Sequence, residues 1–353
     1  PDLLLPLEDC AFTAQRGGMC CVWVQLSGDL PAGSFEARFT CNEKSEAVKI
    51  EVIGAVLPRQ ELIYTNWFHT DCLMSYYGFE AFSPAYWQCA EKFLRRAAEY
   101  GMNCVLTPLF TPPLDTQVGG ERPTVQLVDV QVTGKNEYAF SFGKLDKWIE
   151  MCEKCGIEYF EMSHLFTQWG AKHAPKIVAR KNGKEKKIFG WATKASGKKY
   201  AAFLAQFATA LKKYTKEKGI AQRCIFHVSD EPQARQLKVY KKAADIVHEH
   251  FKGFKIADTL SEFSFYKSGV VETPIPATDH IAPFIGNVPQ LWAYYCGVQG
   301  SKNVSNRFFD MPSERNRIIG FQLYKFDVKG FLHWGYNFYY TRYSKRLADP
   351  FTE

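Results

Sequence analysis

Two adjacent carboxylates, Asp230 and Glu231, follow an apolar run in the segment FHVSDEPQ at positions 226–233. Two acids this close cannot both be comfortably ionised in a dry pocket, so the pKa of one of them is raised. The protonated acid can donate a proton, while the charged one can orient a substrate or stabilise a cation. Because acids and proline also favour the first turn of a helix, the segment also fits an ordinary helix start.

The adjacency of the two acids limits the reaction mechanisms in which they could act. Ordinary retaining glycosidases place two carboxyl groups about 5 Å apart across the sugar, usually on different strands, and adjacent acids do not fit that scheme easily. They fit substrate-assisted hydrolysis of 2-acetamido sugars, in which the acetamido oxygen of the substrate is the nucleophile. The protein then needs one carboxylate to hold the acetamido N–H and one acid to protonate the leaving oxygen. These residues alone do not distinguish galactosamine from glucosamine.

The elements that must position these acids alternate along the chain from residue 62 onward. Helical patterns cover 83–101, 144–156, 198–219, 232–253 and 312–330. Apolar runs that predict strands cover 62–69, 102–109, 157–166, 223–231, 254–260, 275–284, 290–297 and 330–340. Eight strands that alternate with helices predict a (β/α)8 barrel. Little of the sequence after Tyr340 suits an eighth helix, so we expect the barrel to lack it.

Active sites of such barrels lie at the C-terminal ends of the strands, and here nearly every strand ends in polar or aromatic groups. Tryptophans are candidates for stacking on the apolar face of a sugar, and the other side chains for hydrogen bonds to its hydroxyl groups. Each of them also fits a core position, and His227, deeper in its strand, is expected in the core. The candidate site residues are Asn66, His69, His164, Asp230, Glu231, Trp292, Tyr295, Trp334 and Asn337.

Composition limits the other functions. The 353 residues are 46% hydrophobic, enough for a large core, and no run approaches the length of a membrane span. The net charge is +7, and much of the excess lies in residues 172–199. Without a nucleic-acid motif we interpret this segment as a solvated loop, with binding of polyanions as the alternative. No metal or cofactor is expected, and the oligomeric state stays open.

The first 60 residues follow a different sequence pattern from the rest of the chain. Three strand-like runs cover 20–26, 34–42 and 47–57, and they predict part of a β-sandwich-like domain with a linker over residues 1–60, followed by the barrel over 61–353. The 11 cysteines mostly lie within apolar runs, which is typical of reduced thiols and favours the cytoplasm. Since the sequence opens without methionine, a signal peptide in a longer chain stays open.

Several longer motifs resemble glycoside hydrolase family 123, the β-N-acetylgalactosaminidases. They are DCLMSYYGFEAFSPAYW (71–87), VSDEP (228–232), LWAYYC (291–296), NRFFDMP (306–312) and GFLHWGYNFY (330–339). The resemblance covers roughly residues 55–351. It implies a sandwich fused to a barrel and retaining, metal-free, substrate-assisted release of terminal β-linked N-acetylgalactosamine from oligosaccharides or glycolipids.

The resemblance also implies a role for each acid. Asp230 would orient the acetamido group and stabilise the oxazolinium-like intermediate, and Glu231 would act first as general acid and then as base. Two alternatives remain, a β-N-acetylglucosaminidase with the same mechanism and a non-catalytic carbohydrate-binding protein on the same barrel.

Overall fold

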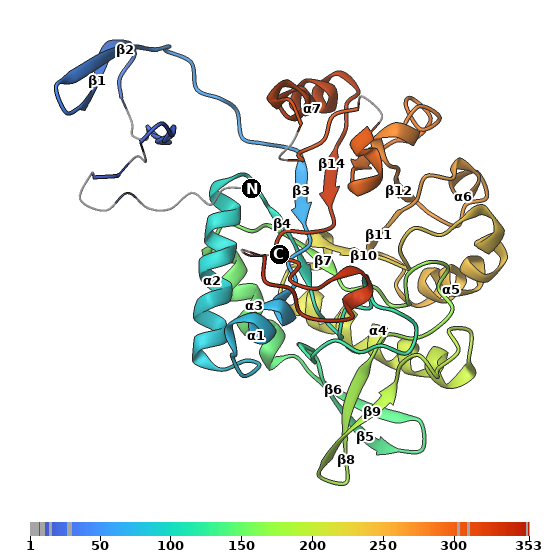
Figure 1. Ribbon diagram of the computed structural model, residues 1–353. Coiled ribbons are helices and arrows are strands. Elements are labelled where there is room, and N and C mark those ends of the chain that lie inside the picture. Colours follow the sequence, from blue (N-terminus) through green and yellow to red (C-terminus); the bar gives the residue numbers. More distant parts are fainter. Residues whose placement is uncertain are drawn as a thin grey trace. The chain divides into compact units, whose positions relative to one another are not determined.

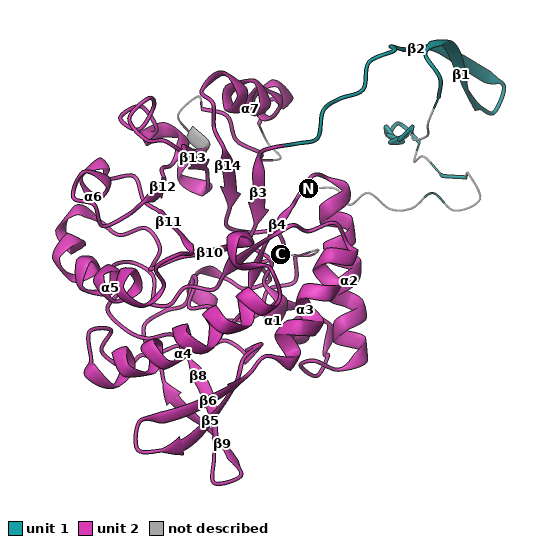
Figure 2. Cartoon of the chain, turned by 180° about the vertical axis from the view of Figure 1, so that it is seen from behind, with its two compact units in different colours: residues 1–60 teal, residues 61–353 magenta. Residues whose placement is uncertain are grey.

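The computed structural model describes residues 7, 11–13, 16–26, 30–301, 304–308, 311–350 and 352. The chain divides into two compact units, residues 1–60 and residues 61–353 (Figure 2). In the first unit, β1 (Gly33–Cys41) and β2 (Lys44–Val52) form an antiparallel hairpin. The strand expected over residues 20–26 is wrong, because these largely exposed residues pair with no other strand. That this unit is part of a sandwich stays a prediction.

The second unit is a nearly closed parallel barrel, which confirms the predicted fold (Figure 1). Seven of the eight predicted strands are present in a shorter form. The strand predicted over 275–284 is wrong in position, because β12 (Thr273–Ile275) ends at the first residue of that range and a 3-10 helix covers Thr278–His280. The gap between the two end strands of this sheet is bridged by a hydrogen bond, in which the Tyr294 N–H donates to the Pro276 carbonyl oxygen at 3.0 Å. The strand order is β12 (Thr273–Ile275), β11 (Lys255–Thr259), β10 (Cys224–Phe226), β7 (Tyr159–Met162), β4 (Cys104–Thr107), β3 (Ile63–Asn66), β14 (Gly330–His333) and β13 (Trp292–Tyr294).

Helices surround these strands largely where the sequence predicts them. The Ser83 hydroxyl accepts the Tyr86 N–H at 3.2 Å and Pro84 occupies the first turn of α2, as the capping pattern indicates. The α-helices are α1 (Thr70–Tyr77), α2 (Pro84–Glu99), α3 (Gly143–Lys154), α4 (Lys198–Glu217), α5 (Leu237–His250), α6 (Phe263–Lys267) and α7 (Ser313–Lys325). The 3-10 helices are η2 (Ala221–Arg223), η3 (Ala234–Gln236), η4 (Thr278–His280), η5 (Gly297–Ser301) and η6 (Arg342–Ser344).

Helix α5 begins five residues later than Pro232, where the sequence places the start. A capping box between Gln233 and Gln236 begins the 3-10 helix η3 first. The segment DEP therefore belongs to the loop after β10 and is not the first turn of a helix. In the described residues after Tyr340 the only helix is the 3-10 helix η6, and no helix of the described chain is long and apolar enough to span a membrane.

The basic segment 172–199 is not a loop, contrary to expectation. It contains the hairpin of β8 (Ile177–Lys181) and β9 (Lys184–Phe189), which joins β5 (Asp129–Gly134) and β6 (Glu137–Ser141) in a four-stranded sheet. The turn is Asn182-Gly183, both with positive φ, and Asn-Gly is the usual two-residue hairpin turn. The lysines of β9 are exposed, whereas Ile177 and Ala179 are buried against the barrel unit's core.

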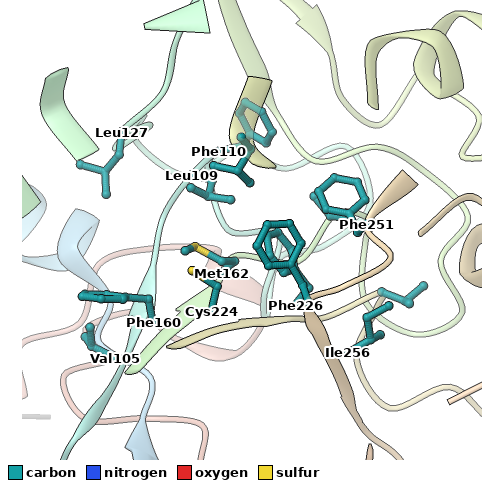
Figure 3. Close-up of a cluster of buried hydrophobic side chains, with 14 of the residues drawn as sticks. Val105, Leu109, Phe110, Leu127, Phe160, Met162, Cys224, Phe226, Phe251 and Ile256 are labelled. Atoms are coloured by element: carbon teal, nitrogen blue, oxygen red, sulfur yellow. The ribbon is translucent and has the colours of Figure 1, made fainter. Parts of the chain in front are cut away.

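The core has two layers because strand side chains alternate between the two faces of the sheet. Inside the barrel lie residues such as Leu106 and Ile225, and outside it, under the helices, lie Val105 and Phe226. Figure 3 shows part of the outer layer, where Phe160 and Phe226 from neighbouring strands lie among aliphatic and aromatic side chains. The tightly packed strands fix the positions of the loops that follow them.

Candidate active site

A cavity of about 690 Å³ opens at the C-terminal ends of the barrel strands. Four of the nine candidate residues line it, namely His69, Asp230, Glu231 and Trp334. Its other lining residues come from the last residues of several strands, from the loops that follow the strands and from the segment after β14. They are Trp67, Leu114, Asp115, Gln168, Trp169, Thr259, Tyr294, Cys296, Gly297, Val298, Leu332, Phe338, Tyr340 and Arg342.

The backbone turns sharply at Glu231, whose φ of 42° lies in the left-handed region. Neighbouring side chains of a regular strand point to opposite faces, but this turn lets Asp230 and Glu231 line the same cavity. The turn is held from both sides. The Glu231 N–H donates to the Thr259 carbonyl oxygen at 3.0 Å, and the Trp169 N–H donates to the Asp230 carbonyl oxygen at 2.8 Å. A strained residue held this way is typical of functional sites.

Each acid receives one hydroxyl hydrogen bond. The Thr259 hydroxyl donates to Asp230 Oδ1, and the Tyr294 hydroxyl donates to Glu231 Oε1 at 2.5 Å. Burial, and then the negative charge of Glu231, raise the pKa of Asp230 well above its usual value, although the Thr259 hydrogen bond works in the opposite direction. Burial and Glu231 also raise the pKa of Tyr294, which keeps its hydroxyl a donor.

A buried polar network lies beneath the pair, inside the barrel. Glu161 accepts hydrogen bonds from Thr65 Oγ1 at 2.6 Å and Trp67 Nε1 at 2.7 Å. The His227 ring lies between two carboxylates, with Nε2 2.7 Å from Glu161 Oε1 and Nδ1 3.4 Å from Asp258 Oδ1. Neither nitrogen is well aligned for a hydrogen bond, although each lies close to a carboxylate oxygen. Burial lowers the pKa of His227, but the two carboxylates outweigh it and raise the pKa to about 10.

Asp258 of this network positions the segment that leads to the two acids. Its carboxylate accepts the backbone N–H groups of Val228 at 3.0 Å and Ser229 at 3.3 Å, and the Tyr240 hydroxyl donates to it from α5. His227 is thus a core residue, as the sequence indicates, and it also contributes a buried positive charge below the two acids.

His69 lines the cavity, and its imidazole ring is neutral. Burial, and then the positive charge of Arg122, lower its pKa to about 3. Arg122 Nη2 lies 3.1 Å from His69 Nδ1, so Nδ1 accepts, and Nε2–H donates to the Trp334 carbonyl oxygen at 3.0 Å. Arg122 is itself buried and pairs with both carboxylate oxygens of Asp71 at 2.6 and 2.7 Å. His69 therefore fixes the loop that carries Trp334.

Five candidate residues do not line this cavity. Asn66 Oδ1 accepts from Arg307 Nη2 at 2.6 Å, and Asn337 exchanges two hydrogen bonds with the His69 backbone at 2.7 and 3.1 Å. His164 is fully buried and stacks on His227 with ring centroids 4.6 Å apart. These three residues lie in the interior of the unit and do not line this cavity, and their predicted role in substrate binding stays a prediction.

Trp292 and Tyr295 lie in the core for reasons of packing. Trp292 points into the barrel, where its indole occupies the space left by the missing side chain of Gly330 on the paired strand. Tyr295 lies on the outer face and packs on Phe331 with centroids 4.9 Å apart. Its neighbour Tyr294 has the opposite orientation and reaches Glu231, because adjacent strand residues alternate.

Several cavity residues were missed from the sequence, above all Thr259, Trp169 and Arg342. Thr259 was detectable, since it lies near the end of a predicted strand. Trp169 and Arg342 lie in loops beyond the strand ends, and no periodicity marks such positions.

Residues 67–353 match the family described as glycoside hydrolase 123, catalytic domain. The chain belongs to glycoside hydrolase family 123. Among solved structures, a family 123 glycoside hydrolase from Clostridium perfringens is similar, with a TM-score of 0.64 and 15% sequence identity over 86% of this chain. This chain spans 55% of the length of that structure. The comparison with curated proteins returned no match.

Two structures from other families show a weaker likeness to this family 123 chain. A family 5 glycoside hydrolase from Bacteroides vulgatus has 11% identity and a TM-score of 0.43, covering 77% of this chain and 58% of that one. A family 10 xylanase from Thermobacillus composti has 12% identity and a TM-score of 0.41, covering 81% and 87%.

Proposed function

We propose that this chain catalyses the release of terminal β-linked N-acetylgalactosamine from glycans or glycolipids, with retention of configuration and through substrate-assisted hydrolysis. The observation that carries the proposal is the pair Asp230 and Glu231 in one cavity, each with its own hydroxyl donor. The similar family 123 enzyme from Clostridium perfringens is described as hydrolysing glycolipid glycans, which supports glycolipid glycans as the substrate class.

In the first step the acetamido oxygen of the substrate attacks the anomeric carbon. Glu231 gives its proton to the leaving glycosidic oxygen, and Asp230 accepts the acetamido N–H as positive charge develops on that group. In the second step Glu231, now a carboxylate, takes a proton from water, and the hydroxide oxygen opens the oxazolinium-like ring at the anomeric carbon. Two displacements at this carbon retain its configuration.

The pKa of Asp230 is raised by burial and by the charge of Glu231. A substrate N–H that donates to the carboxylate favours its charged form, and so does a developing positive charge. Substrate binding therefore favours ionised Asp230, the form in which its carboxylate can accept the acetamido N–H. Tyr294 holds Glu231 Oε1, which leaves Oε2 to face the glycosidic oxygen.

The test is hydrolysis of aryl β-glycosides of N-acetylgalactosamine, N-acetylglucosamine and galactose. We expect cleavage of the N-acetylgalactosaminide alone, reduced about a thousandfold in Glu231→Gln and in Asp230→Asn. For Glu231→Gln the loss should shrink as the leaving group becomes more acidic, since a good leaving group needs no proton. For Asp230→Asn the loss should not depend on the leaving group. Glu262→Gln, an exposed acid outside the cavity, is the control.

The other outcomes are equally informative. Cleavage of the N-acetylglucosaminide as well would keep the mechanism but remove the specificity. Rapid cleavage of the plain galactoside would contradict the substrate-assisted mechanism, because that sugar lacks the acetamido nucleophile. Binding of the sugar without turnover would indicate a non-catalytic carbohydrate-binding protein.

A further inference from the structure

The cavity has an aromatic wall on one side of its mouth. Trp169 lies in the loop after β7, where Trp169, Gly170 and Ala171 all have positive φ values of 57°, 112° and 53°. Trp169 is 36% exposed and lines the cavity. Its backbone N–H donates to the Asp230 carbonyl oxygen at 2.8 Å, and Gln236 Nε2 donates to the Trp169 carbonyl oxygen at 2.6 Å. The loop is therefore anchored directly to a catalytic acid.

The turn of η6 forms a second part of the mouth. Tyr343 and Ser344 have φ values of 65° and 53°, a conformation that persists only where the surroundings hold it. Here the Tyr343 N–H donates to Asp115 Oδ2 at 3.2 Å, and the Ser344 hydroxyl donates to the Asp115 carbonyl oxygen at 2.7 Å. The Tyr343 ring meets the Trp169 ring edge to face, with centroids 5.5 Å apart. The two loops thus form one aromatic rim.

A positive charge lies on this rim. Arg342 is exposed and lines the cavity, and its guanidinium carbon lies 4.7 Å from the centroid of the Tyr343 ring. Burial raises the pKa of Asp115, and the positive charge of Arg342 acts in the opposite direction. Even so, no carboxylate among the residues that the structure describes forms an ion pair with Arg342. The stretch 341–348, TRYSKRLA, contains no acid, and Lys345 is exposed beside the same ring. A guanidinium held over a ring and left without an ion pair is suited to an incoming anion.

We infer that the rim of Trp169, Tyr343 and Arg342 is a subsite for an acidic sugar, the one linked through the bond that is cleaved. This inference rests on the proposed function, which places N-acetylgalactosamine beside Asp230 and Glu231 and the next sugar toward the mouth. The aromatic rim suits the apolar face of a pyranose, and the guanidinium suits a carboxylate or a sulfate ester through two parallel hydrogen bonds.

The experiment compares kcat/KM for two disaccharides that differ only at C6. They are β-N-acetylgalactosaminyl-(1→4)-glucuronic acid and β-N-acetylgalactosaminyl-(1→4)-glucose, and a third probe with a 6-sulfate on the glucose distinguishes sulfate from carboxylate. We expect the acidic probe to react about tenfold faster than the neutral one, with the ratio falling as salt is added. Arg342→Gln should bring the ratio close to one, and Arg342→Lys should restore part of it. Arg180→Gln, which removes an exposed arginine on β8 outside the cavity, should keep it.

Two results would overturn the inference without contradicting the proposed hydrolase activity. One is equal rates for the acidic and neutral probes, and the other is an unchanged ratio of these rates in Arg342→Gln. If no β-N-acetylgalactosaminide is cleaved at all, the proposed function fails instead. The subsite is then judged by titrating tryptophan fluorescence with the same probes. Tighter binding of an acidic probe that depends on salt and on Arg342 supports it, and equal or absent binding overturns it.

Discussion

The Tyr294 hydroxyl donates a 2.5 Å hydrogen bond to Glu231 Oε1, from the strand β13 to the loop after β10. The two residues are 63 positions apart in the chain. Because the bond uses one oxygen of the proposed general acid, it fixes the carboxyl plane and leaves the other oxygen for the substrate. The geometry of proton transfer thus depends on a tyrosine that touches no bond being broken.

Replacing Tyr294 with phenylalanine should lower kcat about ten- to a hundredfold and change KM little, since the orientation of Glu231 matters most in the transition state. Steady-state kinetics on an aryl β-N-acetylgalactosaminide measure both constants. Tyr295→Phe is the matched control, because Tyr295 packs on the outer face of the sheet. An equal loss in both variants would contradict a specific role for Tyr294.

Replacing Thr259 with valine removes the hydroxyl that donates to Asp230. That hydrogen bond stabilises the charged carboxylate and so lowers its pKa, and its loss raises the pKa further. Since the proposed mechanism needs ionised Asp230, the ascending limb of the profile of kcat/KM against pH should move to higher pH. At acidic pH the rate should fall by about tenfold. Thr111→Val, which removes a buried hydroxyl without a hydrogen-bond partner, should leave the profile in place.

Replacing Gly330 with alanine should lower the free energy of unfolding by about 2 kcal/mol or more, because a Cβ there overlaps the buried Trp292 indole. Urea denaturation measures the change. Gly320→Ala on α7 is the control. A Cβ at Gly320 meets open space, and alanine favours a helix, so stability should rise by up to about 1 kcal/mol. A neutral effect at Gly330 would mean that Trp292 can move aside.

Replacing His69 with glutamine should make stability less sensitive to acid. The pKa of His69 is about 3 in the folded protein, below its unfolded value of 6.5. Its contribution to stability is therefore complete above pH 6.5 and is lost as the pH falls toward 3, amounting to about 3 kcal/mol between pH 7 and pH 4. Denaturation curves at several pH values should show a smaller loss for His69→Gln. His250→Gln, at the end of α5, should behave like the unaltered protein.

Much of the site was predictable because it depends on local patterns. Apolar runs located seven of the eight barrel strands, and the barrel in turn predicts that Asp230 and Glu231 lie at a strand end with His69 and Trp334. The choice of Tyr295 over Tyr294 could not be made that way. A strand end is known only to within a residue or two from sequence, and one residue reverses the face on which a side chain lies.

The sequence by itself determined the fold class and the two adjacent acids, since hydrophobic periodicity and chain neighbours are local properties. The tertiary structure alone decided which hydroxyl groups meet those acids, since Thr259 and Tyr294 lie on other strands. It also decided that Trp292 fills the space over Gly330, and that Trp169, Tyr343 and Arg342 share one rim. Contacts between distant segments depend on how the strands and loops pack in three dimensions, and no single stretch of sequence encodes that packing.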